Sequence, residues 1–362
     1  MKPIRILVYG MTNNRGGIET YLLNLFQTLL KYNVILDFVT DFSEIAYQQI
    51  IQTAGSQIYF IPPKGKHPVK HLTAFRKVLK EHSEYSKIYF NILDAGAFFS
   101  MLVPLFYRKE IIVHSHNGNT DKKILHYICR PFLVYAADHK VACSKVAAAY
   151  MFGKSRISET LLIPNMIALS KYRYDIELRK TVREKNNLID KFVICHIGRM
   201  SHQKNPFRLL DIFKEVLLME PKAILLYIGT GELKQQIQQY VYQSGIERAV
   251  VFLGIREDIP EWLCASDVFL LPSLYEGLPI VGVEAQAAGL PCVVSNNISQ
   301  EINISGDVIF CDLEDDNKYW AKKVLETQNM QRSSDNTKLK VAGYDSNCPS
   351  ENYEKLIHCF TN

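Results

Sequence analysis

The stretch DVFLLPSLYEGLPIVGVEAQAAGLPCVVS, residues 267–295, decides the fold class because it holds a strand, a helix and a second strand in succession. The runs at its two ends, 267–273 and 291–295, are apolar almost throughout, as in strands that are covered on both faces of a parallel sheet. Between them, residues 279–289 are mostly apolar or small, and Pro279 suits the first turn of a helix. This order predicts a βαβ unit of an α/β protein.

The same alternation of strands and helices runs along the rest of the chain in two series. The first series begins with the apolar run 4–10, and the second restarts at 192–199 after a polar segment near 165–190. Each series is typical of a parallel sheet with helices on both faces. We therefore expect an α/β fold with two Rossmann-like domains whose sheets face a central cleft.

Length and composition narrow the class of protein. The 362 residues are enough for two cores, and 48% hydrophobic with 22% charged residues is ordinary globular composition. Eight cysteines are scattered without a CxxC pair, which favours a reduced protein over a disulfide framework or a zinc site. The longest apolar run, 95–107, is shorter than the roughly 20 residues of a membrane span. We expect a cytoplasmic protein that does not bind nucleic acid.

The net charge of +5 conceals a difference between the two halves. Residues 1–165 carry 20 Lys and Arg against 11 Asp and Glu, whereas the remainder carries 22 against 26. Such a split suggests that the first half meets an anionic surface.

The basic residues of this half concentrate at 62–82, which has the periodicity of a helix. One helical face is predicted to be apolar: Val69, Leu72, Phe75, Val78 and Leu79. The other faces are predicted to be basic: Lys70, His71, Arg76, Lys77 and Lys80. Two interpretations stay open, an ordinary surface helix and a helix that rests on anionic lipid headgroups.

Candidate binding residues follow the strands, where parallel sheets bind ligands. Gly16 and Gly17 open the helix after the first strand and would let a ligand approach the backbone. Arg199 and Lys204 flank the loop after the strand 192–197, and two cations at a helix N-terminus suit a diphosphate.

Two glutamates of the opening stretch are candidates for binding a sugar. Glu276 follows the strand 267–273, and Glu284 lies about a turn and a half inside the next helix. Carboxylates accept hydrogen bonds from sugar hydroxyls. Because the helix around Glu284 is otherwise apolar or small, this carboxylate should be buried and needs a partner, which a ribose diol would supply.

Seven motifs together carry a resemblance to a known family. They are GGIET, IVHSHN, LIPN, GRMSHQKN, GTGEL, FLG-R-DIP and the opening stretch from Pro272 onward. In this order they resemble the GT4 family of retaining glycosyltransferases, which have the GT-B fold and a Glu-x7-Glu motif, and which include bacterial capsular and exopolysaccharide enzymes. The resemblance covers nearly the whole chain. It departs from the family at Met166, where a glycine is common, and in a short C-terminal region.

The resemblance implies a role for each matching residue. Glu284 would bind the ribose hydroxyls and Glu276 those of the donor sugar, while Arg199 and Lys204 would hold the diphosphate. Residues that would also line the donor site are Gly16, Gly17, Gly229, Gly277 and Leu278. The residues implied in catalysis are His116, Glu276, Arg199 and Lys204.

His116 is chosen over His114 because the two alternate along a strand and should point to opposite faces, with His116 nearer the carboxyl end. Charge on the departing phosphate would be stabilised by cations and helix N-termini. The acidic run 311–317 is interpreted as a solvated turn, so we expect no metal and no cofactor.

The resemblance also implies a different role for each domain. Residues 1–168 would bind the acceptor, 169–349 would bind the nucleotide sugar, and a last helix near 350–362 would return to the first domain. The donor is expected to be a UDP-hexose or a GDP-sugar. The acceptor is expected to be a saccharide linked to a lipid diphosphate, which would place the enzyme peripherally on the inner face of the cell membrane.

Two rival classes remain at this point. A nucleotide-sugar epimerase on the same architecture would need acid and base carboxylates in the first domain, which offers only Glu19, Asp94 and Asp121. An NAD-dependent oxidoreductase is disfavoured because IGTGEL at 228–233 lacks the third glycine and the later acidic residue of a dinucleotide fingerprint.

Overall fold

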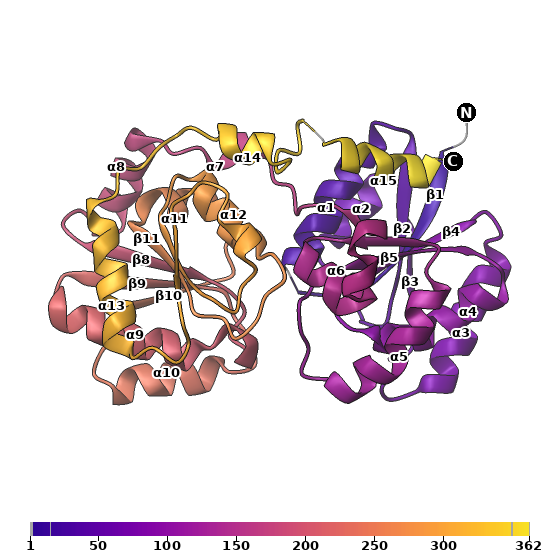
Figure 1. Cartoon of the computed structure of the whole chain (residues 1–362), viewed down its shortest axis with the longest axis horizontal. Helices are drawn as coiled ribbons and strands as arrows, with labels where there is room; N and C mark the ends of the chain where they lie inside the picture. The colour runs from indigo at the N-terminus through magenta and orange to yellow at the C-terminus, as the bar shows by residue number, and fades with distance from the viewer. Residues whose placement is uncertain (1–2, 15, 349, 362) are drawn as a thin grey trace. The chain divides into compact units, whose positions relative to one another are not determined.

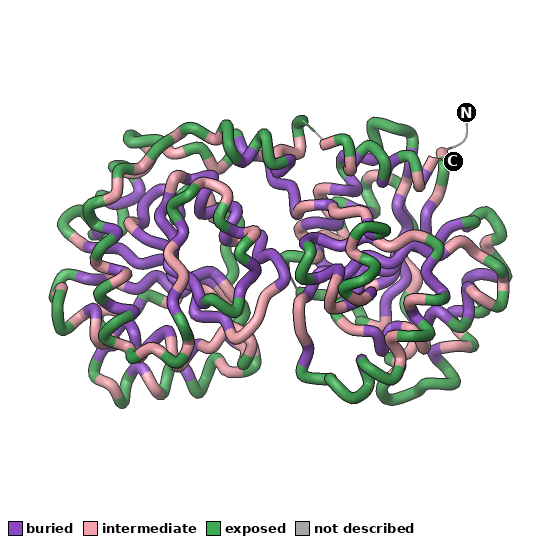
Figure 2. The backbone as a smooth tube through the Cα atoms, in the orientation of Figure 1, coloured by how far each residue is buried: buried purple, intermediate pink, exposed green. Residues whose placement is uncertain are grey.

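The computed structural model describes residues 3–14, 16–348 and 350–361. The chain forms two compact units, Met1–Met166 with Pro349–Asn362 (unit 1) and Ile167–Cys348 (unit 2) (Figure 1). The divisions expected from the sequence were 1–168 with a last helix near 350–362, and 169–349. In both units buried strands form the interior and exposed residues gather on the outer helices and loops (Figure 2).

Unit 1 is built on a seven-stranded sheet in the order β3-β2-β1-β4-β5-β6-β7, whose neighbouring strands pair in parallel. Its strands are β1 Ile4–Tyr9, β2 Val34–Thr40, β3 Ile58–Phe60, β4 Lys87–Ile92, β5 Glu110–Ser115, β6 His139–Ala142 and β7 Leu161–Leu162. Its α-helices are α1 Gly17–Leu30, α2 Gln48–Thr53, α3 Pro68–Glu81, α4 Phe98–Phe106, α5 Lys123–Ala136, α6 Lys145–Phe152 and α15 Glu351–Thr361.

The last helix, α15, packs on unit 1 because one of its faces is apolar. Tyr353, Leu356, Ile357 and Phe360 are buried in the same core as α1 and the strands of the sheet. The Nζ of Lys87 also donates to the carbonyl of Cys359 at 2.6 Å. Burial of four large side chains explains why the chain returns to its first unit at the end.

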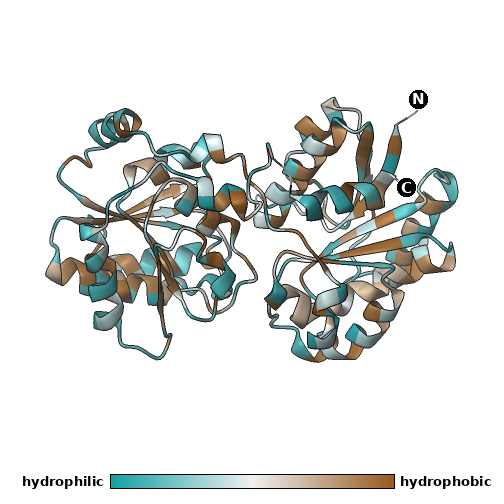
Figure 3. Cartoon of the chain, turned by 45° about the horizontal axis from the view of Figure 1, so that its top comes forward, coloured by the Kyte–Doolittle hydropathy of each residue, from teal (hydrophilic) through white to brown (hydrophobic). Residues whose placement is uncertain are grey.

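Unit 2 is built on a six-stranded sheet in the order β10-β9-β8-β11-β12-β13, again with parallel pairings. Its strands are β8 Phe192–Ile197, β9 Ala223–Ile228, β10 Val250–Gly254, β11 Val268–Leu271, β12 Cys292–Ser295 and β13 Val308–Cys311. Its α-helices are α7 Leu169–Tyr172, α8 Ile176–Lys185, α9 Pro206–Met219, α10 Lys234–Gln243, α11 Ile259–Ala265, α12 Ile280–Ala287, α13 Asn317–Glu326 and α14 Thr337–Val341. The hydrophobic strands of both sheets stand out in Figure 3.

Strand order reverses between β8 and β11, and this reversal positions the candidate site. The loops that leave two such strands diverge, which opens a crevice at the carboxyl edge of the sheet. Because β8 and β11 pair in parallel, the loops 198–205 and 272–279 start side by side. The opening stretch of the sequence therefore lies next to the predicted diphosphate loop. Unit 1 has the same reversal, between β1 and β4.

The apolar face predicted for residues 62–82 was wrong at two positions. Val69 is 73% exposed, whereas His71 is buried with Phe75, Val78 and Leu79. Positions 71, 75, 78 and 79 share one helical face, and Val69, two residues before His71, lies away from it. The His71 ring is satisfied by the carbonyl of Pro62 at 2.8 Å and the hydroxyl of Ser100 at 2.9 Å, and burial lowers its pKa.

Candidate functional site

The loop between β8 and α9 is fixed by the neighbouring loop between β9 and α10. Backbone N–H groups of Gly198 and Met200 donate to the carbonyls of Ile228 at 2.9 Å and Thr230 at 3.0 Å. Gly229 has a φ of +134°, and a Cβ there would lie 2.1 Å from the carbonyl oxygen of Gly198. The packing of the two loops is thus enough to require a glycine at the first position of the GTGEL motif.

Lys204 and Glu276 form an ion pair across the two loops at the crevice. The Nζ of Lys204 lies 2.5 Å from Oε1 of Glu276, and the side chains are only 16% and 11% exposed. Gln203 supports the pair, since its Nε2 donates to the carbonyl of Tyr275 at 3.0 Å and approaches Oε2 of Glu276 at 3.4 Å. The sequence predicted these two residues for different parts of a ligand, and the structure pairs them directly with each other.

Arg199 does not join this pair. Its side chain is 56% exposed and its Nε lies 3.0 Å from Oε2 of Glu232, in the β9–α10 loop. An exposed pair of this kind contributes little to stability, so Arg199 can exchange its partner for an arriving anion at small cost. Glu232 was not singled out in the sequence, although it lies in the GTGEL motif.

His196 lies beneath the predicted diphosphate loop and was also missed. Its Nδ1 bonds the carbonyl oxygen of Leu270 at 2.9 Å, and burial lowers its pKa to about 4, so the ring is neutral. A Cβ on Gly198 would lie 3.1 Å from Nε2 of His196 and 3.2 Å from Cδ of Lys204. A side chain at position 198 would thus press on the His196 ring and the stem of Lys204.

Glu284 is buried inside α12, as the sequence predicted. It is 6% exposed, and burial raises its pKa to about 7. The hydroxyl of Tyr172, the last residue of α7, donates to its Oε1 at 2.7 Å. The buried carboxylate thus has a protein partner of its own. Nothing in the sequence around Tyr172 indicated this contact.

The start of α12 completes the crevice. Leu278 and Gly277 are buried just before the helix, and Pro279 at its N-cap position provides no side-chain hydrogen bond. Free backbone N–H groups at such an end favour a negative charge.

In unit 1, Gly16 and Gly17 begin α1 at the end of the β1 loop. The carboxylate of Glu19 holds this loop, since it accepts from Oγ1 of Thr12 at 2.6 Å and from the N–H of Gly16 at 3.2 Å. Asp94 accepts from the N–H of Gly96 at 2.8 Å. Two of the carboxylates that an epimerase would need are therefore used to shape loops.

The prediction that His114 and His116 point to opposite faces was wrong. Their ring centroids are 4.0 Å apart, and both rings pack against Tyr21. β5 ends at Ser115, so the alternation of side chains no longer applies at His116. Its Nε2 bonds Oδ1 of Asn91 at 2.9 Å, and burial lowers its pKa to about 3, which keeps the ring neutral.

The acidic run 311–317 forms a turn and a helix cap. The N–H of Asp312 donates to Asp315, and Oδ1 of Asp316 accepts from the N–H of Tyr319 at the start of α13. Within residues 3–14, 16–348 and 350–361, no group of three or more His, Cys, Asp and Glu residues is arranged to hold a metal ion.

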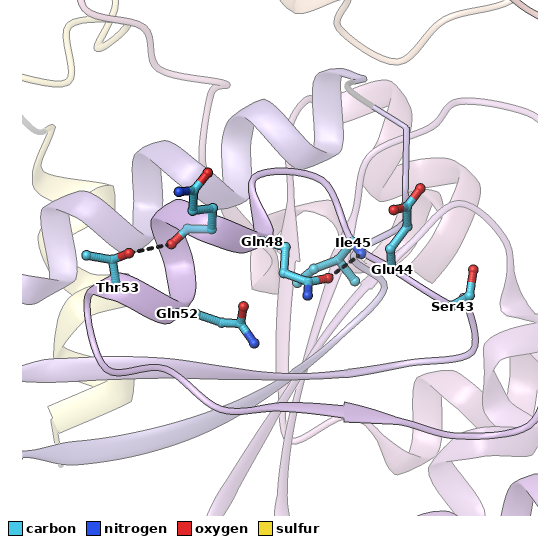
Figure 4. A pocket seen from close by; sticks show the side chains of 7 residues that line it. Ser43, Glu44, Ile45, Gln48, Gln52 and Thr53 are labelled. Carbon is cyan, nitrogen blue, oxygen red and sulfur yellow. Dashed lines mark hydrogen bonds between the residues drawn. The ribbon is translucent and has the colours of Figure 1, made fainter.

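A separate polar pocket of about 500 Å³ lies on unit 1 beside α2 (Figure 4). Its hydrogen bonds are internal, as between the N–H of Ile45 and Oε1 of Gln48 at 3.4 Å. Glu44 is the one titratable residue among those that line the pocket, so we assign the pocket no chemical role.

Comparisons with known proteins agree on one class. Residues 179–338 match the family model of glycosyl transferases group 1. EpsF of Bacillus subtilis, which is named as a glycosyltransferase, is 28% identical over 360 residues, covering 95% of this chain and 93% of EpsF. An Escherichia coli UDP-Gal:α-D-GlcNAc-diphosphoundecaprenol α-1,3-galactosyltransferase is 38% identical over 141 residues, 37% of this chain and 36% of that protein.

Solved structures show the same architecture. HepE of Anabaena superposes with a TM-score of 0.82 at 18% identity, covering 99% of this chain and 100% of HepE. Staphylococcus aureus TarM superposes with a TM-score of 0.76 at 12% identity over the full length of both chains.

The two parallel α/β units and the solved structures show the GT-B fold, which confirms the predicted fold class. The match to the family model and to the relatives in sequence shows a glycosyltransferase. Within that class, residues 179–338 resemble the glycosyl transferases of group 1, whose family model covers most of unit 2. Both of these relatives carry the name of a glycosyltransferase, and neither name supports the epimerase alternative.

Proposed function

We propose that the protein transfers a sugar from a UDP-sugar to a lipid-linked saccharide, with retention of anomeric configuration, in the assembly of an exopolysaccharide or capsule. The observation that carries the proposal is the buried Glu284 carboxylate of α12, together with the Lys204–Glu276 pair at the crevice of unit 2. The HepE structures with UDP-glucose and with UDP and glucose support the donor class. The name of the Escherichia coli relative supports a lipid-diphosphate acceptor.

The proposed roles follow from charge and burial. Glu284 accepts the ribose hydroxyls, because a buried carboxylate gains most from donors that replace lost water. Lys204, Arg199 and the start of α12 bind the diphosphate, and Glu276 accepts from the donor sugar. Gly229, Gly277 and Leu278 shape the donor site. In unit 1, Gly16 and Gly17 let the substrates approach the backbone, and His116 contacts the donor sugar.

During transfer, the bond between the anomeric carbon and the phosphate oxygen breaks, and its electron pair goes to the phosphate. The acceptor oxygen bonds to the same carbon, and its proton passes to the oxygen of the departing phosphate. The cations at the crevice stabilise the charge that collects on the leaving phosphate. Because His116 is buried and neutral, it acts through hydrogen bonds rather than as a charged group.

A panel of nucleotide sugars in a thermal-shift assay tests the donor class. A UDP-sugar at about 100 times its dissociation constant should stabilise the protein by about 2.7 kcal/mol. NAD serves as the negative control. No shift with any UDP-sugar or GDP-sugar, together with a shift from NAD, would contradict the proposal.

We expect transfer to proceed in EDTA, because Lys204, Arg199 and the α12 N-terminus carry the positive charge at the crevice. The measurement is the initial rate of nucleoside diphosphate release before and after chelation. Loss of the rate in EDTA and its return with Mg²⁺ or Mn²⁺ would show that these groups are not sufficient.

Tyr172→Phe should weaken nucleotide binding by roughly tenfold at neutral pH, since one hydrogen bond to a charged group contributes about 1.5 kcal/mol. The hydroxyl lowers the pKa of Glu284, so its loss should raise that pKa further. Titration calorimetry at pH 6, 7 and 8 should show the weakest binding at pH 6. Tyr242→Phe, on the exposed side of α10, is the matched control. Equal affinities of Tyr172→Phe and wild type at all three pH values would show that Tyr172 does not support nucleotide binding.

A further inference from the structure

Helix α5 of unit 1 exposes most of its large apolar side chains. The α5 face consists of Ile124, Leu125, Tyr127, Ile128, Phe132 and Tyr135, which are 80%, 48%, 58%, 61%, 57% and 94% exposed. At 100° per residue these positions span an arc of about 160°. The buried face of the helix holds only His126, Leu133 and Ala136. In Figure 2, exposed residues lie along this part of unit 1.

The apolar surface continues from α5 onto α4. The rings of Phe98 and Phe132 stack with centroids 5.7 Å apart. Beside them a groove of about 640 Å³ is lined by Leu105, Pro131 and Tyr135, among others. Exposed apolar side chains that gather in one place mark an interaction site, whereas single exposed apolar side chains are ordinary.

Cations lie next to these apolar side chains. Lys122 and Lys123 are exposed at the start of α5, and Arg108 and Lys109 line the groove. Arg76 of α3 lies 5.3 Å from the ring centroid of Phe106, which is itself 70% exposed. Residues 62–140 as a whole carry 13 Lys and Arg against 6 Asp and Glu.

We propose that the α5 face inserts into the headgroup and upper acyl region of an anionic lipid bilayer. An apolar helix face flanked by Lys and Arg is the composition that lies flat in a membrane interface. The helix has 14 residues, and the part of the chain that the structure describes contains no helix long and apolar enough to cross a membrane. Tyr127 and Tyr135 suit the interface, because their rings are apolar and their hydroxyls remain hydrated.

The cations beside the α5 face favour an anionic lipid surface over a second copy of the chain as its partner. Two α5 faces packed together would bring Lys122, Lys123, Arg108 and Lys109 of both copies close, and like charges repel. Anionic headgroups attract the same cations, each contributing about a fivefold gain in affinity, or about 1 kcal/mol. The basic face of α3, with Lys70, Arg76, Lys77 and Lys80 exposed, adds to this attraction.

Insertion and charge should respond differently to salt. Attraction of exposed cations to headgroups is screened beyond about 8 Å at physiological ionic strength, whereas burial of apolar side chains is not. Wild type should therefore stay partly bound to anionic vesicles in 0.5 M NaCl. This surface is independent of the donor chemistry proposed above, and its test requires no nucleotide.

The test is sedimentation of the whole protein with phosphatidylglycerol–phosphatidylcholine vesicles at low and high salt. A triple variant, Ile124→Ser with Ile128→Ser and Tyr135→Ser, changes side chains at least 61% exposed and should fold normally. We expect at least tenfold weaker partitioning at both salt concentrations. The matched control removes three equally exposed apolar side chains of unit 2: Leu218→Ser, Tyr242→Ser and Val341→Ser, at 77%, 75% and 84%. This control should bind as wild type does.

A second variant separates the charge contribution. Reversal of Lys70, Arg76, Lys77 and Lys80 to glutamate should release the protein at low salt by more than a hundredfold. If the α5 triple variant and wild type sediment alike, the proposal is overturned, whatever the charge variant does. A wild-type dimer in size-exclusion chromatography that the triple variant abolishes, without an effect on sedimentation, would assign the face to a second copy instead. A thermal shift with nucleotide sugars in both variants would show that the substitutions leave the donor site intact.

Discussion

Replacing Glu284 by alanine should weaken UDP binding by roughly 30- to 1,000-fold, equivalent to about 2–4 kcal/mol, because two ribose hydroxyls would lose a buried charged acceptor. The carboxylate is 6% exposed and is held by Tyr172, so it is already oriented before a ligand arrives. Titration calorimetry with UDP measures the effect. Glu247→Ala, an exposed glutamate of the same unit, is the control. An unchanged dissociation constant for Glu284→Ala would show that this residue does not bind the nucleotide.

The raised pKa of Glu284 also predicts a dependence of stability on pH. Its pKa is about 7 in the folded protein, against an ordinary value of 4.5 for glutamate. Between these values the folded state holds a proton that the unfolded state has lost, so stability falls as pH rises through this window. The cost is complete above pH 7 and is about 3 kcal/mol for a shift of this size. Glu284→Gln should therefore stabilise the unliganded protein at pH 8 and have little effect at pH 4.5, as chemical denaturation can show.

Replacing Lys204 by alanine should lower kcat by roughly 100- to 10,000-fold, because a cation placed at a leaving phosphate contributes most in the transition state. The Michaelis constant should change far less than kcat. Initial rates with the donor found in the panel measure both. Lys214→Ala, at a half-buried lysine of α9 that pairs with Asp211, is the matched control.

Lys204→Ala also leaves Glu276 as an unpaired, largely buried carboxylate, so stability must be measured beside activity. The double variant Lys204→Met with Glu276→Gln removes both charges and should restore stability without restoring kcat. Recovery of activity in this double variant would mean that the pair serves folding rather than transfer.

The sequence predicts the fold and the crevice because both depend on order along the chain. Apolar strands alternating with helices specify two parallel sheets, and the loops after β8 and β11 must meet because those strands pair. Glu276 and Lys204 were therefore predicted at the same edge. Their direct ion pair was not, because spacing does not reveal which side chains touch.

The residues that were missed come from contacts distant in sequence. Tyr172 reaches Glu284 across 112 positions, from a polar segment with no recognisable pattern. His196 lies within an apolar strand, where a buried histidine looks like any core residue. The wrong statement about His114 and His116 had a different cause, since the strand ended one residue earlier than the alternation assumed.

The most direct measurement is a crystal structure of the protein with a UDP-sugar bound. Both ribose hydroxyls should lie within hydrogen-bond distance of the Glu284 carboxylate, with the diphosphate at Lys204 and the sugar at Glu276. A nucleotide bound elsewhere, with Glu284 in contact only with Tyr172, would contradict the assignment of this crevice as the donor site.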